Sequence, residues 1–217
     1  MVDVETAAMT PVIFGTSCLG NLYREVPFGT KVEIAAEWFK AFPKPFIDSA
    51  GKYGAGLSLE CIGKALRELG KKPGDLTISV KLGWRRSRRL RRVGDAAPYQ
   101  YEEPTFEPGA WKGLEWDAEQ DISEEGIIRC YDEAKELLGY PIDYVSVHDP
   151  DEYLGSGGKL EFEVGVGEKG RGERREDVIG AYHALNTSSP GRIVQNAAYA
   201  TAVVPEAFWS GLFGGSK

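Results

Sequence analysis

Short apolar runs alternate with helical patterns along this chain, and this alternation constrains the fold more than any other feature. Four runs rich in Val, Ile or Phe are typical of buried strands: residues 11–14, 45–48, 77–82 and 143–148. Apolar residues at helical spacing separate these runs and also follow the last one, at 31–41, 58–69, 123–138 and 173–185. Alternating strands and helices favour a parallel sheet with crossover helices.

Two of the helical patterns carry start signals. Ser58 and Ser123 each stand at the first position of such a pattern, and acidic residues follow Ser123 in the first turn. A serine there is typical of an N-cap, whose hydroxyl accepts a bond from the helix backbone. The sequence therefore predicts helices that begin at these two serines.

Three stretches interrupt the alternation. Residues 84–120 form a long polar connection between a strand and a helix, residues 155–176 are rich in glycine and charge, and residues 186–217 follow neither pattern. A connection as long as the first is usually functional or disordered. We expect one domain over residues 1–217, with 84–120 as a long βα loop and 186–217 as an atypical C-terminal segment.

The composition excludes several classes of function. The formal net charge of −7 argues against a general nucleic-acid binder. No apolar run approaches the ~20 residues that span a bilayer, and the N-terminus lacks the features of a secretory signal. The three cysteines are too few and too far apart for a disulfide framework or a zinc site. We therefore expect a cytoplasmic protein that contacts neither nucleic acid nor membrane.

Two motifs invite a functional interpretation that their context does not favour. RRSRRLRR (85–92) could bind an anion, but a solvated loop is the simpler prediction. GVGEKG (165–170) fits the dinucleotide pattern G-x-G-x-x-G, yet no acidic residue lies ~20 positions beyond its first glycine. A lone match of this kind is weak, so we favour a flexible loop for this second motif.

A metal site is a third alternative. His148, Asp149 and Asp151 carry side chains that suit divalent ions. The second histidine, His183, has no ligand-like neighbour in its helical pattern, and Asp-Pro-Asp reads equally well as a turn. We therefore favour the turn.

Three of the predicted strands carry a polar residue at or near their C-terminal end: Asp48, Lys81 and His148. In a barrel of parallel strands these ends converge on one face, where active sites are built. Lys81 lies among apolar neighbours, where an unpaired ammonium would be costly, so Asp48 is its expected partner. Tyr53 follows Asp48 in a glycine-rich loop. We expect these four residues, the tetrad, to converge.

Such a tetrad has a coherent chemical role. An ammonium beside a phenol favours the phenolate, so Tyr53 could donate or accept a proton on a carbonyl or hydroxyl oxygen. Asp48 would hold Lys81 in place, and His148 would orient the substrate. A nicotinamide could supply the hydride transfer that no side chain can perform. The chemistry points to a carbonyl–alcohol redox enzyme.

Four ordered motifs resemble the aldo-keto reductases: FGTSCLGNLY (14–23), FIDSAGKYGAGLSLECIGKAL (46–66), ISVKLG (78–83) and YVSVHDPDEY (144–153). The stretch EPTFEPGAWKGLEWDAEQDISEEGI (103–127) is most similar to the L-fucose or D-threo-aldose 1-dehydrogenase type. The resemblance implies a (β/α)8 TIM barrel that binds NADP or NAD without a Rossmann domain. It also implies oxidation of an aldose to a lactone at the C1 hydroxyl, or reduction of an aldehyde.

The resemblance assigns roles to individual residues. Tyr53 would be the proton donor or acceptor, with Asp48 and Lys81 as its supporting pair and His148 as the substrate-orienting residue. The positions that approach the nicotinamide would be Gly15, Thr16, Ser17 and Asp48. Trp84, just past Lys81, would line the substrate pocket beside Tyr53 and His148.

The chain also departs from the family pattern. Complete barrels of this kind typically need ~250 residues, whereas this chain has 217 and loses the family pattern after about residue 185. We therefore expect an incomplete barrel of about four to six parallel strands, truncated or altered near its end. Two alternatives follow: a catalytically impaired remnant of such an enzyme, or a metal-dependent barrel enzyme acting on sugars.

Overall fold

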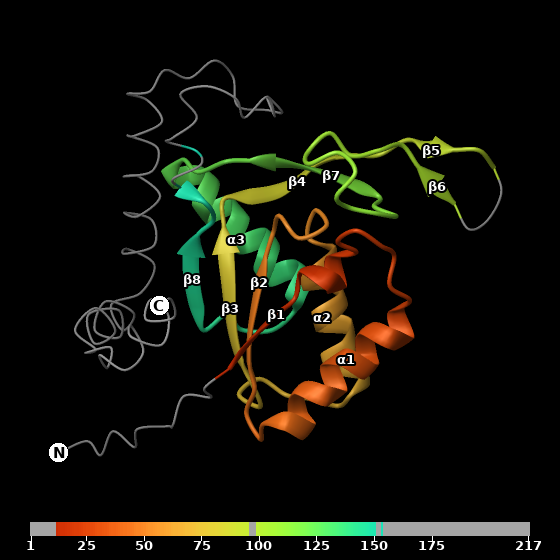
Figure 1. Ribbon diagram of the computed structural model, residues 1–217. Coiled ribbons are helices and arrows are strands. Elements are labelled where there is room, and N and C mark those ends of the chain that lie inside the picture. The colour runs from red at the N-terminus through yellow and green to blue at the C-terminus, as the bar shows by residue number, and fades with distance from the viewer. Residues whose placement is uncertain (1–11, 96–98, 151–152, 154–217) are drawn as a thin grey trace, which may run out of the picture.

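Four parallel strands form the central sheet of the computed structural model, which describes residues 12–95, 99–150 and 153. The strands follow the order β1-β2-β3-β8 and comprise Ile13–Gly15, Phe46–Ala50, Thr77–Leu82 and Tyr144–Val147 (Figure 1). Each pairs with its neighbour in parallel register. The four predicted strands are confirmed, with ends displaced by one or two residues at three of them.

Three α-helices cover this sheet: α1 (Phe28–Ala41), α2 (Leu57–Glu68) and α3 (Glu124–Leu138). A short 3₁₀ helix, η1 (Ser17–Gly20), follows β1. α2 packs between α1 and α3 and also contacts β2, while α3 contacts β3. The predicted helices at 31–41, 58–69 and 123–138 are confirmed, and α1 begins three residues earlier than expected. The predicted helix at 173–185 and the GVGEKG motif lie outside the described residues.

The two predicted serine caps have different outcomes. The Ser123 hydroxyl accepts a bond from the backbone N–H of Gly126 at 3.0 Å, so this N-cap is confirmed. The prediction for Ser58 is wrong, because the helix begins at Leu57 after Gly56, which has a left-handed φ of 80°. Ser58 is instead fully buried, and its hydroxyl donates to the carbonyl of Thr16 at 2.8 Å. This bond ties the start of α2 to the end of β1.

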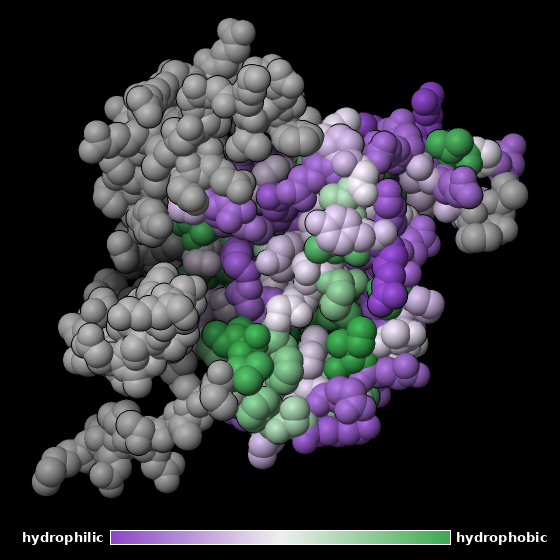
Figure 2. All heavy atoms as spheres, viewed as in Figure 1, coloured by the Kyte–Doolittle hydropathy of each residue, from purple (hydrophilic) through white to green (hydrophobic). Residues whose placement is uncertain are grey.

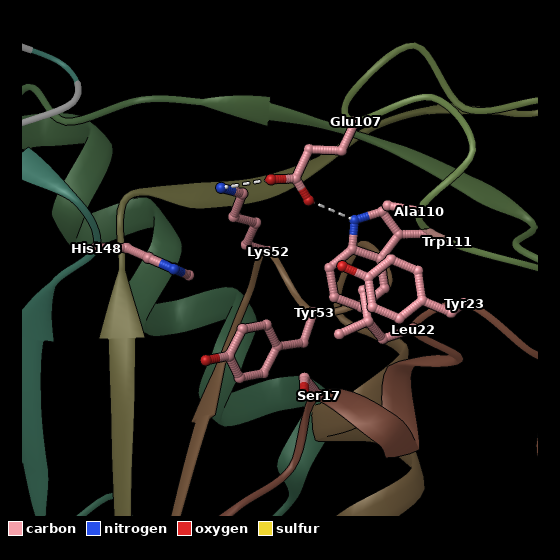
Figure 3. Close-up of a pocket in the computed structure, with 9 residues that line it drawn as sticks. All are labelled: Ser17, Leu22, Tyr23, Lys52, Tyr53, Glu107, Ala110, Trp111 and His148. Carbon is pink, nitrogen blue, oxygen red and sulfur yellow. Dashed lines mark hydrogen bonds and ion pairs between the residues drawn. The ribbon is translucent and has the colours of Figure 1, made fainter.

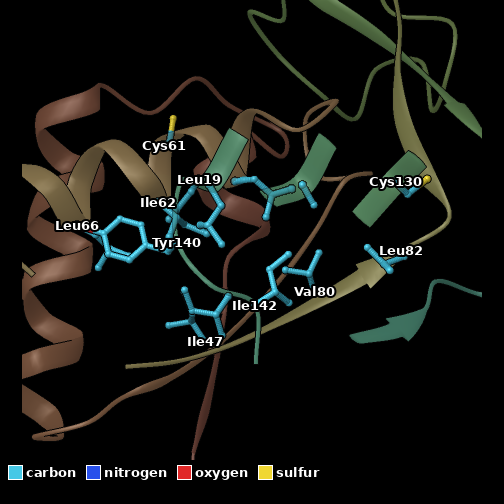
Figure 4. Close-up of a cluster of buried hydrophobic side chains, with 14 of the residues drawn as sticks. Leu19, Ile47, Cys61, Ile62, Leu66, Val80, Leu82, Cys130, Tyr140 and Ile142 are labelled. Carbon is cyan, nitrogen blue, oxygen red and sulfur yellow. The ribbon is translucent and has the colours of Figure 1, made fainter. Parts of the chain in front are cut away.

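The core lies between the sheet and the helices. Alternate residues of β3 are buried, and Ile78, Val80 and Leu82 join the apolar faces of the helices (Figure 4). Fully burying one such side chain contributes roughly 1.5–3 kcal/mol. The opposite face of β3 is half-buried and carries Lys81. This alternation therefore directs Lys81 away from the helix layer.

Residues 84–120, the hairpin segment, connect β3 to α3, where the sequence predicts a long βα loop, and this connection contains strands. It contains two antiparallel pairs: β4 (Trp84–Arg89) with β7 (Trp116–Gln120), and β5 (Arg92–Val93) with β6 (Gln100–Tyr101). The segment extends from the C-terminal ends of the central strands (Figure 1). It has its own buried apolar cluster, which Ala55 of the β2–α2 turn completes: Leu90, Phe106, Trp111, Leu114 and Ala118.

The arginine cluster is correspondingly not a solvated loop. Four of its arginines lie in β4, and each forms an ion pair with a carboxylate: Arg85 with Glu119 and Asp121, Arg86 with Glu60, Arg88 with Glu102 and Asp117, and Arg89 with Glu115. All these carboxylates except Glu60 lie later in the chain, between residues 102 and 121. The positive charge is therefore neutralised within the protein.

The surface of the hairpin segment differs in polarity from the surface of the sheet. Hydrophilic residues predominate over the hairpin segment, while apolar residues gather over the lower part of the sheet (Figure 2). Val12 and Ile13 at the start of β1 are 44% and 51% exposed. Among the described helices, none has the length and apolarity that crossing a membrane requires.

Candidate active site

Asp48 and Lys81 meet because β2 and β3 project them from the same face. The register pairs Asp48 with Ser79 and Ala50 with Lys81, so the longer lysine side chain reaches back along its neighbour strand. Lys81 Nζ forms an ion pair with Asp48 Oδ2, and the two side chains are 28% and 22% exposed. The Lys81 ammonium and the Asp48 carboxylate are therefore paired in a partly buried environment.

Tyr53 stands in a tightly constrained turn after β2. Its N–H donates to the carbonyl of Ala50 at 3.2 Å, and its own carbonyl accepts from Ser58 N at 3.2 Å. A Cβ added to Gly20 would lie 2.6 Å from the backbone carbonyl carbon of Tyr53, so only glycine permits this contact. The turn therefore fixes the direction of the phenol.

The Tyr53 hydroxyl accepts a hydrogen bond from Lys81 Nζ at 3.1 Å. Burial by itself disfavours the Lys81 ammonium, but the bonds to Asp48 and Tyr53 outweigh it and raise the pKa of Lys81. The ammonium is therefore present at neutral pH, directly beside the phenol oxygen. It can stabilise negative charge that develops there.

His148 completes the group from the end of β8. Its backbone N–H donates to the carbonyl of Leu82 at 2.8 Å, and its ring stands edge-on to Tyr53 with centroids 5.8 Å apart. Burial lowers the pKa of His148 to about 4, with help from the charges of Lys52 and Lys81 and against the opposing charge of Asp149. The imidazole is therefore neutral at neutral pH, and its Nδ1 has no hydrogen-bond partner among the described residues.

The structure thus brings together the four residues that the sequence predicts to converge. Two of them, Tyr53 and His148, line a pocket of about 340 Å³ (Figure 3), whereas Asp48 and Lys81 are not among its lining residues. The pocket is lined by Ser17, Leu22, Tyr23, Lys52, Tyr53, Glu107, Ala110, Trp111 and His148. Trp84, which the sequence places in the pocket wall, is not among them. Its ring packs against Phe106 at 6.0 Å and lies beneath Lys52 Nζ at 5.1 Å.

Sequence reasoning missed six residues of this pocket, and three of these six, Lys52, Glu107 and Trp111, are joined by polar contacts. Lys52 is buried, and its Nζ lies 2.8 Å from Glu107 Oε1 and 3.7 Å from Asp149 Oδ2. The second Glu107 oxygen accepts a bond from Trp111 Nε1 at 2.7 Å. The position of Lys52 next to Tyr53 was the only available signal, since Glu107 and Trp111 arrive from the hairpin segment.

The residues at the end of β1 leave space beside Asp48. Gly15 pairs with Asp48 in register and borders open space, because a Cβ built there would meet no described atom within 4 Å. Thr16 is fully buried and donates to the carbonyl of Asp48 at 2.9 Å, which fixes this strand end. Ser17 reaches the pocket itself. The sequence assigned these three residues to the cofactor, and their placement beside Asp48 is compatible with that role.

The described residues hold no group of three or more His, Cys, Asp or Glu side chains suited to a metal ion. Asp149 Oδ2 lies 3.2 Å from His148 Nε2, and the two form an ion pair only when the ring is protonated. Asp151, the third residue of that alternative, lies outside the described residues.

A curated enzyme is similar in sequence to part of this chain. Pyridoxal 4-dehydrogenase from Microbacterium luteolum is 32% identical over 143 residues, which cover 65% of this chain and 40% of that enzyme. The chain thus spans less than half the length of this relative.

Two solved structures align with part of this chain. A glycerol dehydrogenase from Gluconobacter oxydans aligns with a TM-score of 0.41 and 23% identity, covering 64% of this chain and 36% of that one. A Pseudomonas aeruginosa protein assigned to the aldo-keto reductases aligns with a TM-score of 0.46 and 18% identity, covering 82% and 51%.

The model of the aldo/keto reductase family matches residues 11–188, which is most of the chain. This match includes the four strands of the sheet and every residue of the tetrad. The chain therefore belongs to the aldo/keto reductase family, whose fold is a (β/α)8 barrel.

Proposed function

We propose that this protein is an NAD(P)-dependent oxidoreductase that oxidises the C1 hydroxyl of an aldose of the L-fucose or D-threo-aldose class to a lactone. With a reduced nicotinamide as the hydride donor and Tyr53 as the proton donor, the same site would reduce an aldehyde to an alcohol. One observation carries the proposal: Lys81 Nζ contacts both Asp48 and the Tyr53 hydroxyl at the edge of a pocket that His148 also lines.

Each residue of the tetrad has one task in this reaction. The Tyr53 oxygen accepts the C1 hydroxyl proton as the C1–H bond breaks, and the Lys81 ammonium stabilises the charge on that oxygen. Asp48 holds the ammonium in place. Neutral His148, which lines the pocket, orients the substrate oxygen.

A bound nicotinamide would accept the hydride that leaves C1. Gly15, Thr16 and Ser17 would hold its ring against the end of β1, next to Asp48. Positions for the phosphate and adenine groups fall outside this part of the barrel, so either NAD or NADP is compatible with the site.

The aldose substrate rests on the resemblance of residues 103–127 and on the polar lining of the pocket by Lys52 and Glu107. Pyridoxal is a second candidate, because the curated relative at 32% identity is a pyridoxal 4-dehydrogenase. Assays of L-fucose, D-threo-aldoses and pyridoxal, each with NAD and NADP, would separate the two. Turnover of pyridoxal alone would exclude the aldose proposal.

A catalytically impaired remnant is the main alternative. Such a remnant would bind its cofactor weakly, whereas an active enzyme would bind it at working concentrations. A fluorescence titration with NADPH would measure this affinity alongside the turnover assays. Substrate-dependent reduction of NAD(P) at high cofactor concentration supports the enzyme, whereas no reduction with any substrate supports the remnant.

A further inference from the structure

An ion pair at the rim of the pocket has no task in the proton and hydride chemistry. Lys52 Nζ and Glu107 Oε1 are 2.8 Å apart, and both side chains line the pocket together with Tyr53 and His148 (Figure 3). The Lys52 side chain is only 11% exposed, whereas that of Glu107 is 35% exposed. A substrate in the pocket would therefore meet both charges.

A hydrogen bond and a constrained backbone conformation fix the position of Glu107. Its second oxygen accepts from Trp111 Nε1 at 2.7 Å, and its backbone adopts a left-handed φ of 48°, which is uncommon for a residue other than glycine. The ammonium of Lys52 lies over the ring of Trp84, 5.1 Å from the ring centroid. The pair is thus preorganised and does not depend on a flexible side chain finding its partner.

The charges at this rim do not cancel. Lys52 contributes one positive charge, while Glu107 and Asp149 contribute two negative charges within 4 Å of its ammonium. Deeper in the site, Lys81 and Asp48 neutralise each other. The rim therefore presents both a cationic donor and carboxylate acceptors, with a net negative charge.

Such a rim suits neighbouring hydroxyl groups. One hydroxyl can accept from Lys52 while the next donates to Glu107, whereas an anionic substrate would meet an excess of carboxylate. We propose that the Lys52–Glu107 pair determines substrate specificity, selecting neutral polyhydroxylated compounds and excluding anionic ones. This inference rests on the proposed aldose dehydrogenase function and names the residues that would select its substrate.

The test measures binding by the full-length chain through tryptophan fluorescence, since Trp111 lines the pocket. L-fucose is the neutral probe, and L-fuconate, its carboxylate counterpart, is the anionic one. We expect the unmodified chain to prefer L-fucose. Glu107→Gln should weaken L-fucose binding and strengthen L-fuconate binding, each by about tenfold, because it removes one rim carboxylate.

Glu103→Gln is the matched control, since it removes the same charge from an exposed position in the same segment. An unchanged preference in this variant, together with a reversed one in Glu107→Gln, supports the inference. Equal effects of the two variants would overturn it. Lys52→Met provides a second variant should Glu107→Gln fold poorly, and it should weaken L-fuconate binding further. Stronger or unchanged L-fuconate binding in Lys52→Met would also overturn the inference.

Turnover measured on the same samples separates this inference from the proposed function. A chain that prefers L-fucose through Glu107 but never reduces NAD(P) would refute the redox proposal and leave the specificity pair intact. A chain that oxidises L-fucose with no change of preference in Glu107→Gln would refute the specificity pair alone. A chain that binds neither probe refutes the specificity pair.

Discussion

The candidate active site is built from two regions that are held together by different forces. The sheet region supplies Asp48, Lys81 and His148 from strand ends whose positions follow from parallel backbone register. The hairpin segment supplies Glu107 and Trp111, which depend on ion pairs and on a small apolar cluster.

This difference suggests a division of tasks. Backbone register cannot shift without moving a whole strand, so the sheet is suited to chemistry that requires fixed distances. Side-chain contacts in the hairpin segment can change without disturbing the sheet. We therefore expect changes in the sheet region to abolish turnover, and changes in the hairpin segment to alter substrate affinity.

The largest expected effect is that of Tyr53→Phe. Loss of the phenol should lower kcat by about 10²–10⁴-fold, because the Tyr53 hydroxyl is the proposed proton donor and acceptor. The ring itself is retained, including its contacts with Trp111 and His148, so thermal stability should change little. Comparison of kcat and Tm for the two proteins checks this. Substantial turnover in the variant would show that the proton comes from elsewhere.

Asp117→Ala should act on the hairpin segment instead. The Asp117 carboxylate is 1% exposed, accepts from Thr105 N at 3.0 Å and Thr105 Oγ1 at 2.8 Å, and pairs with Arg88 at 3.2 Å. Its loss should destabilise the segment by roughly 3–5 kcal/mol, as for other buried and paired charges.

Because Thr105 lies close to Glu107 in the chain, we expect KM to rise in Asp117→Ala while kcat falls only a few-fold. Urea unfolding and steady-state kinetics measure the two effects, with Asp117→Asn as an intermediate control. A collapse of kcat comparable to that of Tyr53→Phe would contradict the division of tasks.

The free energy of unfolding at acidic pH should depend on His148 in the sheet region. The pKa of His148 is lowered from 6.5 to about 4 chiefly by burial, so the unfolded chain binds this proton more readily than the folded one. The folded state should therefore lose up to about 3 kcal/mol as the pH falls from roughly 6.5 towards 4.

His148→Gln should flatten this part of the profile of unfolding free energy against pH. Asp121 and Glu60 have lowered pKa values, since their bonds to basic partners outweigh burial, and their stabilisation is lost only at more acidic pH. If the unmodified protein and His148→Gln gave identical profiles between pH 6.5 and 4, His148 would bind its proton as readily in the folded state as in the unfolded state.

The smallest expected effect concerns the outer arginines of the hairpin segment. Arg89 is 69% exposed, and its guanidinium lies 3.7 Å from Glu115. Arg89→Gln should change the free energy of unfolding by no more than about 0.5 kcal/mol, because solvent screens such a pair. A chemical denaturation curve suffices as the measurement. A larger loss would show that the ion pairs of β4 act as a cooperative network.

The sequence was informative where local patterns determine structure. Short apolar runs and helical spacing predicted the four strands and three helices, and polar residues at strand ends predicted that the tetrad would meet. The Ser58 cap failed because its hydroxyl bonds to Thr16, a contact between residues far apart in the sequence. Local spacing contains no information about such a contact.

The hairpin segment was not predictable for a related reason. An arginine-rich run is normally solvated, and the carboxylates that pair with β4 mostly lie far along the chain in polar stretches without strand periodicity. The burial of Lys52 likewise depends on Glu107, 55 positions later in the chain. Pairing of distant charges therefore decided both the fold of this segment and the rim of the pocket.

The most direct test of the account follows the hydrogen at C1. L-fucose carrying deuterium at C1 would be incubated with the full-length chain and a high concentration of NAD or NADP, and the reduced cofactor would be analysed by mass spectrometry. We predict that the deuterium appears in the reduced nicotinamide, and that Tyr53→Phe abolishes this transfer. Absence of deuterium from the reduced cofactor, or equal transfer by Tyr53→Phe, would contradict the proposal that the tetrad catalyses oxidation at C1.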